Sequence, residues 1–384
     1  MVLVCQLLEG IRAHPKDKEM LQVTCSKLGQ LVENREALKI HAKESGAIPL
    51  LLQVIHSNPR EGELVAAALW ALTVTYRRLE SSQRQAVDHS AISVIMMAMQ
   101  LLPAHGGVQQ WGCWALAILV SLYTAAIAQV IDAGGVELVV ATMKRHADNP
   151  SLLEYACWAL WNLTYDASIG PRRVAEAGGI EAIIGVMRAH SDGVRVQYHG
   201  CATLVNIAHN IEHRRHIATC GGIQAVLAAM HRHATNAELL HHACRAIDTL
   251  SIGAEGNKDL IADLDGVAAV VRAMWDHARE VTVLQYACRA LLNITANSTR
   301  NQVRAMEVGA VEAVLAAMRA HPAALEVQWY GCWALLNTAW TSTAIQQDMV
   351  AMGVGEYARR AAWAFPGHAE LQNRCQQLLA RLGA

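Results

Sequence analysis

Ten cysteines carry the most obvious potential chemistry in this 384-residue chain, because thiols ligate metals, form disulfides and act as nucleophiles. Eight of them recur at a nearly constant spacing. Cys25 begins the series, and we expect Ala66 to occupy the next equivalent place. The others follow at intervals of 43 or 44 residues: Cys113, Cys157, Cys201, Cys244, Cys288, Cys332 and Cys375. A residue that recurs once per period marks one structural position of a repeat.

The spacing argues against disulfides within this series. Equivalent points of successive repeats lie about one helix–helix distance apart, roughly 8–10 Å. A disulfide needs Cα atoms within about 7 Å of each other. We therefore expect these cysteines to be buried as small hydrophobic residues, which fits a reducing compartment. Only Cys5 and Cys220 fall outside the series.

Histidines form a second periodic series, and each is expected to end a short apolar helix. A helix carboxyl end has unpaired carbonyl groups and partial negative charge, so a histidine suits it as a donor. The functional alternative is pH sensing by several partly charged histidines. The members of the series are His14, His56, His105, His146, His190, His233, His277 and His321.

No metal or other cofactor is expected. Four histidines crowd one repeat, His231, His233, His241 and His242, but they lack a recognised metal-ligand spacing. The sequence also lacks the phosphate-binding and nucleophile motifs GxxxxGK[ST], GxGxxG after a strand and GxSxG. Enzymatic activity is therefore not expected of this chain.

Composition narrows the class of protein. The chain is 53% hydrophobic, which rules out intrinsic disorder, and 17% charged with a net charge of −1. A charge near zero argues against nucleic-acid binding, which requires a basic excess. No apolar run approaches the roughly 18 residues of a membrane span, so no membrane insertion is expected. No signal peptide is visible at the start of the chain.

The helices that position these residues are marked by short sequence motifs, or words, that recur once per repeat. CWALWNLT opens at Cys157 and CWALLNTA at Cys332, and upstream stand words such as GGIEAIIGVMRAH, which opens at Gly178. The motifs of one repeat therefore predict, in order, a short helix, a glycine break, a helix of about ten residues, a polar loop and a longer helix. The glycine pair ends the first helix in a left-handed conformation. We call these the first, second and third helices of a repeat.

The pattern of three helices in about 43 residues, with the third-helix word WAL-x-N, resembles the armadillo repeat family of importin-α-like and catenin-like proteins. The resemblance covers the chain and implies an all-α, right-handed armadillo-repeat superhelical solenoid of about nine three-helix units, with partial end units. We predict one continuous array over 1–384. The approximate units are 1–33, 34–78, 79–122, 123–166, 167–210, 211–254, 255–298, 299–342 and 343–384.

Both ends of the array read as incomplete repeats. Met1 to His14 reads as a second helix without a first, and Leu371 to Leu382 reads as a third helix. Solenoids usually cap their ends with polar-faced repeats. We expect either a fragment of a longer protein or an array whose ends are covered by partners.

In armadillo solenoids the third helices line a concave groove. On a helical wheel, Tyr155, Trp158 and Asn162 share a side that is distinct from the apolar core side. By resemblance this side is the groove. The predicted peptide-binding residues are Trp114, Tyr155, Trp158, Asn162, Asn206, Arg245, Tyr286, Arg289, Asn293, Tyr330, Trp333 and Asn337.

The residue types suit an extended ligand. An asparagine amide offers both a donor and an acceptor to a peptide backbone. Neighbouring tryptophan rings form slots for the alkyl stems of peptide side chains. The alternative is structural, since aromatic rings can pack against the next repeat and an asparagine can satisfy its backbone groups.

The charges on this side point to the ligand. Arg245 and Arg289 stand near the centre of the array, which suits an acidic segment better than the basic signals that importin-like grooves read. Asp248 and Asp166 are nearby but do not make an acidic track. We therefore expect a ligand with acidic character near the array centre.

The function predicted is a non-catalytic protein–protein interaction scaffold that holds an extended partner segment in its groove. One alternative is a structural subunit of a large axonemal or organellar assembly that uses its ends and convex face. Another is a regulatory array of a longer multidomain protein. We expect an intracellular, reducing location, in the cytoplasm first, with nuclear, ciliary and organellar sites left open. The sequence leaves the partner, the pathway and the oligomeric state open.

Overall fold

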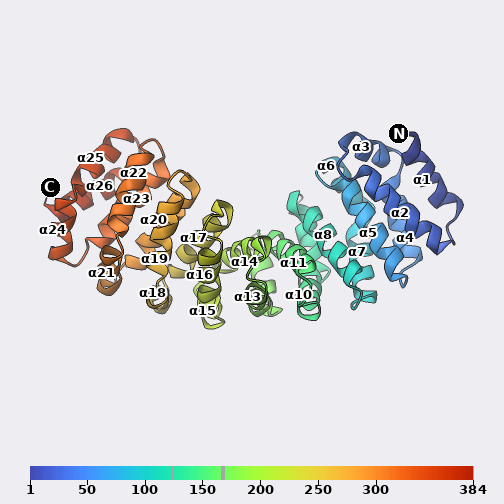
Figure 1. Cartoon of the computed structure of the whole chain (residues 1–384), viewed down its shortest axis with the longest axis horizontal. Helices are drawn as coiled ribbons and strands as arrows, with labels where there is room; N and C mark the ends of the chain where they lie inside the picture. Colours follow the sequence, from blue (N-terminus) through green and yellow to red (C-terminus); the bar gives the residue numbers. More distant parts are fainter. Residues whose placement is uncertain (123, 166–168, 384) are drawn as a thin grey trace. The chain divides into compact units, whose positions relative to one another are not determined.

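The computed structural model describes residues 1–122, 124–165 and 169–383. Over these residues the secondary structure consists of 26 helices, and no strand occurs among them (Figure 1). The all-α prediction is therefore confirmed. Contacts divide the chain into two compact parts, Met1–Val186 and Met187–Ala384, which we call unit 1 and unit 2. Each of them contains several three-helix units, which are called repeats below.

Unit 1 begins with a second helix and a third helix, and the triplets follow. Its helices are α1 (Val2–Ala13), α2 (Lys18–Val32), α3 (Glu36–Glu44), α4 (Ala47–Ser57), α5 (Gly62–Tyr76), α6 (Glu80–Asp88), α7 (Ala91–Leu101), α8 (Gly106–Leu122), α9 (Thr124–Asp132), α10 (Gly135–Arg145), α11 (Pro150–Leu163) and α12 (Gly170–Glu176). Helix α13 (Gly179–Ala189) spans the division between the units.

Unit 2 continues the same alternation. Its helices are α14 (Val194–Ile207), α15 (Ile211–Thr219), α16 (Gly222–Arg232), α17 (Ala237–Ser251), α18 (Glu255–Asp263), α19 (Gly266–Asp276), α20 (Val281–Thr295), α21 (Thr299–Glu307), α22 (Ala310–Ala320), α23 (Leu325–Thr338), α24 (Thr343–Ala351), α25 (Val354–Ala364) and α26 (Ala369–Leu382).

The turn between first and second helices is set by a left-handed residue. Gly134 has φ 81°, a conformation that costs glycine nothing. The next residue, Gly135, leaves no room for a side chain, since a Cβ there would lie 2.3 Å from Cγ1 of Val130. The predicted glycine break is therefore confirmed, although Ser90 and Asp265 adopt the same left-handed turn at φ 62° and 56°.

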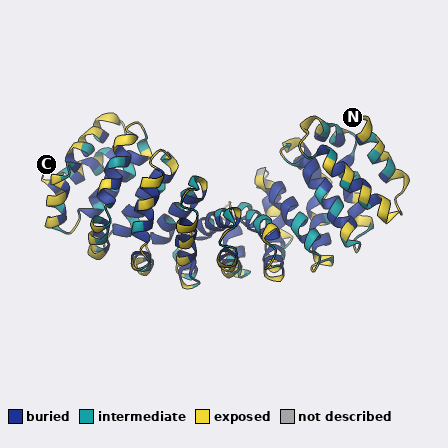
Figure 2. Cartoon of the chain, viewed as in Figure 1, coloured by how far each residue is buried: buried dark blue, intermediate teal, exposed yellow. Residues whose placement is uncertain are grey.

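Third helices form the centre of each unit by packing against one another. In unit 1 the order is α2, α5, α8 and α11, and in unit 2 it is α14, α17, α20, α23 and α26. Each second helix packs on the third helix of its own repeat, as α4 does on α5. Figure 2 shows the resulting burial along the sides where helices meet, with exposed residues on the outer sides and at the loops.

Cysteines of the periodic series lie in this third-helix layer. All eight are buried and none is more than 1% exposed, and every cysteine is a free thiol. Burial raises the pKa of the Cys157, Cys201, Cys244 and Cys288 thiols to about 12. Such thiols are protonated and inert at neutral pH, so the prediction of a buried apolar role is confirmed.

One expectation about the cysteine series is wrong. Helix α5 begins at Gly62, which places Leu69 and not Ala66 at the cysteine position. The thiols of Cys332 and Cys375 lie with their Sγ atoms 3.6 Å apart. The expected separation of roughly 8–10 Å applies to helix axes, whereas these two side chains point toward each other across the interface.

His146, His233, His277 and His321 stand at the C-cap positions of their second helices, as expected, but their side chains bond to the preceding repeat. The ring Nε2 of His233 bonds the Ser191 carbonyl at 2.7 Å, and that of His277 bonds the Ala234 carbonyl at 2.7 Å. His146 and His321 make the same bond, to the carbonyls of Pro103 and Ala278, at 2.8 Å. A carbonyl only accepts, so Nε2 carries the proton in each case. We call this contact the histidine staple.

Two members of the expected histidine series do not occupy the staple position. Helix α4 ends at Ser57 with Asn58 as its C-cap, so Asn58 and not His56 is equivalent to His277. Helix α7 has Leu102 as its C-cap, and His105 lies one loop further on. Asn58 and Leu102, and not His56 and His105, continue the period of 44 residues from His14 to His146.

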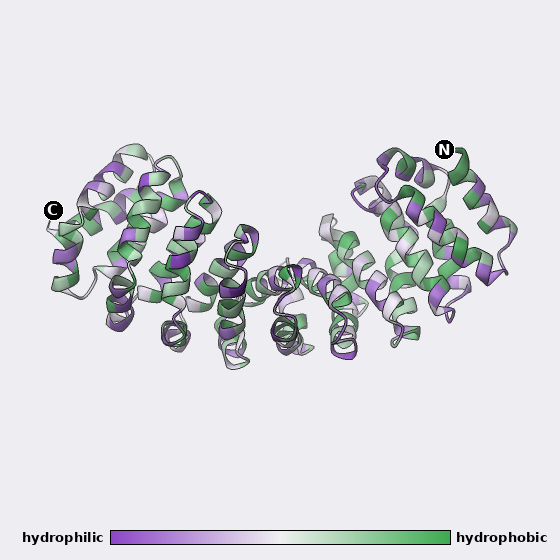
Figure 3. Ribbon diagram, viewed as in Figure 1, coloured by the Kyte–Doolittle hydropathy of each residue, from purple (hydrophilic) through white to green (hydrophobic). Residues whose placement is uncertain are grey.

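Hydropathy varies along the helices, as Figure 3 shows by the mixture of hydrophobic and hydrophilic residues within most of them. Among the described residues, no single helix is long and apolar enough to cross a membrane. One bent helix pair, Ala125–Asp132 with Gly135–Arg145, reaches the necessary length and composition jointly, with 68° between its two parts.

Candidate functional site

Five aromatic side chains and one asparagine, most of them half-buried, line the third helices of unit 1. We call this set the unit 1 strip, and it comprises Trp70, Trp111, Trp114, Tyr155, Trp158 and Asn162. Spacings of three and four residues along α8 and α11 place them on one helix side. Because α5, α8 and α11 pack side by side, the strip continues from one helix to the next.

The rings of the unit 1 strip contact one another. Trp114 stacks on Tyr155 with ring centroids 5.4 Å apart, and Trp111 lies 5.6 Å from Trp114 and 6.4 Å from Trp70. Trp114 is only 5% exposed, and the Arg77 guanidinium covers its ring at 5.4 Å. Trp114 therefore packs mainly within the protein, whereas Tyr155 and Trp158 keep part of their surface in solvent.

Asparagines of the predicted ladder bridge consecutive third helices. Nδ2 of Asn162 donates to the Ala117 carbonyl at 2.9 Å, and Nδ2 of Asn337 donates to the Leu292 carbonyl at 2.8 Å. Asn293 donates in the same way to Oδ1 of Asp248 at 2.7 Å. These bonds use the amide nitrogen within the protein, as the structural alternative expects, and the amide oxygens take no part in them.

Unit 2 carries a different set at the equivalent positions and at residues next to them. We call it the unit 2 strip, and it comprises Tyr198, His199, His241, His242, Arg245, Asp248, Tyr286, Arg289, Asn293, Trp329, Tyr330, Trp333 and Asn337. The rings on α14, α17 and α20 contact one another in turn, and Tyr198 meets His242 edge-on at 4.6 Å. His241 then stacks between His242 and Tyr286, at centroid distances of 4.7 and 4.9 Å.

The histidines of the unit 2 strip are neutral at neutral pH. Burial, reinforced by nearby cationic groups, lowers the pKa of His199 and His242 to about 3. Burial and the Arg245 charge lower the pKa of His241 as well. The positive charge of this strip therefore comes from its arginines.

The unit 2 strip contains one buried carboxylate, that of Asp248, which lies beside Arg289. Asp248 is 0% exposed, and one of its oxygens lies 3.1 Å from an Nη of Arg289. Burial raises the pKa of Asp248, and the Arg289 charge and the Asn293 hydrogen bond oppose that rise. Asp248 thus holds Arg289 in place. It also offsets part of the positive charge that is expected to contact an acidic ligand.

The arginines also cover tyrosine rings. The Arg289 guanidinium lies 5.3 Å from the Tyr286 ring and 5.2 Å from the Tyr330 ring, and Arg245 lies 5.7 Å from Tyr286. Such cation–π contacts fix the long side chains. Arg245 has no ion-pair partner among the described residues, so its charge is the less compensated of the two.

The end of the unit 2 strip is aromatic again. Trp329 stacks on Tyr330 at 4.8 Å, and the Arg374 guanidinium covers Trp333 at 3.9 Å. Asn206 is half-buried on α14. Asp166 lies outside the described residues.

Sequence reasoning missed several members of these strips. Trp70 stands 44 residues before Trp114, so the period that the cysteines define identifies it once Leu69 takes the cysteine position. Arg77 and Arg374 cover tryptophan rings from positions outside the period of the predicted site, and no sequence signal marks them.

Comparison with known proteins agrees with this geometry. Residues 128–314 match the family model described as LRRK2 ARM repeat. Beta-catenin, in a structure concerned with a phosphorylation switch in its interaction with cadherin, has a TM-score of 0.80 and 15% identity, covering 98% of this chain and 68% of that one. No curated protein matches.

Engineered proteins provide two further structural matches. One has a TM-score of 0.74 at 21% identity and covers 100% of both chains, and another has a TM-score of 0.56 at 23% identity over 64% of this chain and 98% of its own. Identities this low show the fold alone. The three-helix repeats and these structural matches show an armadillo-type helical-repeat fold, and residues 128–314 are similar to the LRRK2 ARM repeat family.

Proposed function

We propose that this protein is a non-catalytic scaffold whose third helices form a groove for an extended segment of a partner protein. The observation that carries the proposal is the unit 2 strip, in which half-exposed rings and arginines follow one another along α17, α20 and α23. Rings of this kind accept alkyl stems and peptide faces without requiring one particular sequence.

The charge of the strip defines the segment further. Arg289 is paired with Asp248, whereas Arg245, beside Tyr286, has no ion-pair partner among the described residues. We propose a ligand with an acidic residue placed near Arg245 and with apolar or aromatic residues on either side of it. Because Asp248 offsets Arg289, one acidic side chain suits this site better than an acidic run.

A library of short unstructured peptides tests the proposal. Peptides selected on the full chain are expected to carry an acidic residue and to bind Arg245→Glu about tenfold more weakly, the equivalent of about 1.4 kcal/mol. Trp333→Ser is expected to weaken the same peptides, since Trp333 is half-buried on the strip. Circular dichroism checks that both variants are folded.

Trp363→Ser is the matched control, because Trp363 is 86% exposed on α25, a second helix. Peptides that bind Arg245→Glu and Trp333→Ser as tightly as the wild type would contradict a third-helix groove. Loss of binding in Trp363→Ser alone would move the site to the outer face.

That outer face supports a second candidate function. Trp275 and Trp363 occupy the same position of second helices α19 and α25 and are 49% and 86% exposed. Exposed tryptophans are typical of interaction surfaces. In a subunit of a large assembly, these residues would contact neighbouring subunits. We place either role in a reducing intracellular compartment, in the cytoplasm first, because the repeat core contains eight buried thiols.

A further inference from the structure

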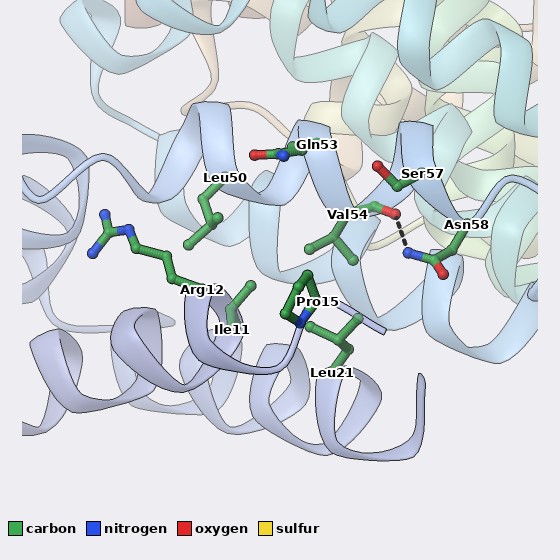
Figure 4. Close-up of a pocket in the computed structure, with 9 residues that line it drawn as sticks. All are labelled: Ile11, Arg12, Pro15, Leu21, Leu50, Gln53, Val54, Ser57 and Asn58. Atoms are coloured by element: carbon green, nitrogen blue, oxygen red, sulfur yellow. Dashed lines mark hydrogen bonds between the residues drawn. The ribbon is translucent and has the colours of Figure 1, made fainter. Parts of the chain in front are cut away.

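A cavity of about 280 Å³ lies between α1 and α4 in unit 1 (Figure 4). Its wall is apolar, because Ile11, Leu21 and Val54 are buried there and Pro15 and Leu50 complete it. Polar side chains line it as well, namely Arg12, Gln53, Ser57 and Asn58.

The same place in unit 2 is almost filled. A cavity of about 10 Å³ lies between α16 and α19. Its lining residues Met230, Ala234, Leu240 and Ala273 are the repeat equivalents of Ile11, Pro15, Leu21 and Val54. The two cavities are therefore one position of the repeat in an open and a closed form.

The two linings differ in side-chain size in both directions, since Met230, Arg272 and Asp276 of the closed cavity are larger than their equivalents Ile11, Gln53 and Ser57. Leu50 and Val54 in the open cavity are larger than their equivalents Ala269 and Ala273 in the closed one.

The histidine staple does differ between the two places. At the closed cavity, Nε2 of His277 bonds the Ala234 carbonyl at 2.7 Å and links the two repeats. Asn58 takes the position of His277 at the open cavity, and its Nδ2 donates to the Val54 carbonyl of its own helix at 2.9 Å (Figure 4).

The Pro15 carbonyl is consequently left without its repeat-specific donor. It is the equivalent of the Ala234 carbonyl, and no described side chain donates to it. Arg12 donates elsewhere, from its Nη2 to the Ser45 carbonyl at 2.9 Å. The cavity thus combines an apolar wall, an available acceptor and the space that a ring fills elsewhere.

We propose that this cavity binds one tryptophan side chain of a partner protein. The indole ring lies against Ile11, Leu21 and Val54, and its N–H donates to the Pro15 carbonyl, as His277 does to Ala234. A volume of about 280 Å³ is below the range of roughly 300–1,000 Å³ typical of drug-sized ligands, so it suits one large side chain. Tryptophan combines a large apolar surface with a single donor. This site is independent of the third-helix strips.

Fluorine NMR on the full chain tests the proposal with three probes. They are 5-fluoroindole, 5-fluoroindene, which has the same shape without the N–H, and a capped Gly-Trp-Gly peptide whose indole carries fluorine. The indole and the peptide are expected to show line broadening with the wild type. The indene is expected to bind about tenfold more weakly, because it has no N–H to donate to the Pro15 carbonyl.

The informative variant is Asn58→His, which supplies the missing staple. It is expected to abolish broadening of both indole probes and to raise the midpoint of thermal unfolding. Leu50→Trp fills the cavity from its half-exposed rim and provides the same test if Asn58→His does not fold. His277→Asn, at the closed cavity, is the control and is expected to leave wild-type binding intact.

Three results would overturn the proposal. The first is unchanged indole binding in folded Asn58→His and Leu50→Trp. The second is equal binding of indole and indene, which would exclude the Pro15 carbonyl as the acceptor. The third is binding of free indole without binding of the peptide, which would show that the cavity does not admit a side chain attached to a backbone.

Discussion

The strips of units 1 and 2 share several positions of the repeat, and the side chains at those positions pack differently. Trp70, Trp114 and Trp158 stand in unit 1 where Arg245 and Arg289 stand in unit 2. The unit 1 rings cover one another, as Trp114 and Tyr155 do at 5.4 Å. In unit 2 the long arginine side chains lie across tyrosine rings, and Asp248 neutralises one of them from below.

The difference shows that one position of the repeat can hold a buried apolar side chain in unit 1 and a partly exposed charged side chain in unit 2. Trp114 is 5% exposed and contributes mainly apolar burial. The Arg289 side chain is 30% exposed while that of Asp248 is 1% exposed, so its contribution depends on a buried ion pair. Substitutions in unit 1 are therefore expected to change stability, and those in unit 2 to change binding and pH dependence as well.

The largest effect is expected at Trp114. Trp114→Ala removes a nearly buried indole and should lower the free energy of unfolding by about 3–5 kcal/mol. Trp363→Ala, at a residue that is 86% exposed, should change it by less than about 0.5 kcal/mol. Denaturant unfolding followed by circular dichroism measures both, and equal effects would refute the packing role of Trp114.

Breaking the ion pair of unit 2 should have a somewhat smaller effect. Arg289→Met leaves Asp248 buried without its cation and is expected to cost about 3 kcal/mol. Arg245→Met removes a tyrosine contact but no ion pair, so about 1 kcal/mol or less is expected. If the two variants unfold at the same denaturant concentration, Asp248 does not depend on Arg289 for its stability.

A staple variant should have a smaller effect still. His277→Asn removes the bond from Nε2 to the Ala234 carbonyl and is expected to lower the free energy of unfolding by about 1 kcal/mol. His56→Asn is the matched control, since His56 is exposed and is not at the staple position. An effect of His56→Asn as large as that of His277→Asn would contradict the staple.

The smallest effect concerns pH. Burial raises the pKa of Asp248 in the folded state, so folding favours its protonated form. Its favourable contribution is fully present below the unfolded pKa, about 3.9, and is lost as pH rises through the folded value. Wild type is therefore expected to lose stability relative to Asp248→Asn as pH rises above about 4. A series of thermal melts checks this, and a difference that does not change with pH would contradict it.

The periodic part of the structure could be predicted from the sequence. The cysteine spacing and the glycine pairs define the repeat, because each repeat must bury the same face and make the same turn. The cysteine position of helix α5 could not be assigned to Leu69 in the same way. Leu69 and Ala66 stand in one apolar run that has no cysteine and matches the repeat motif only weakly.

Contacts between repeats could not be predicted in the same way. The histidine staple and the bond from Asn162 to Ala117 each join residues 43 or 45 positions apart. Their partners are backbone carbonyls, which leave no mark in the sequence. The pair of Asp248 and Arg289 likewise depends on how α17 and α20 are aligned, which the residue types alone do not specify.

Site-specific photo-crosslinking tests the groove most directly. Benzoylphenylalanine would replace Arg245 on α17 in one variant and Trp363 on α25 in another, each with a peptide selected on the wild-type chain. A third-helix groove predicts crosslinks from position 245, with the peptide's acidic residue near the crosslinked site, and none from position 363. Crosslinks from position 363 alone would contradict the groove and place the ligand on the second helices.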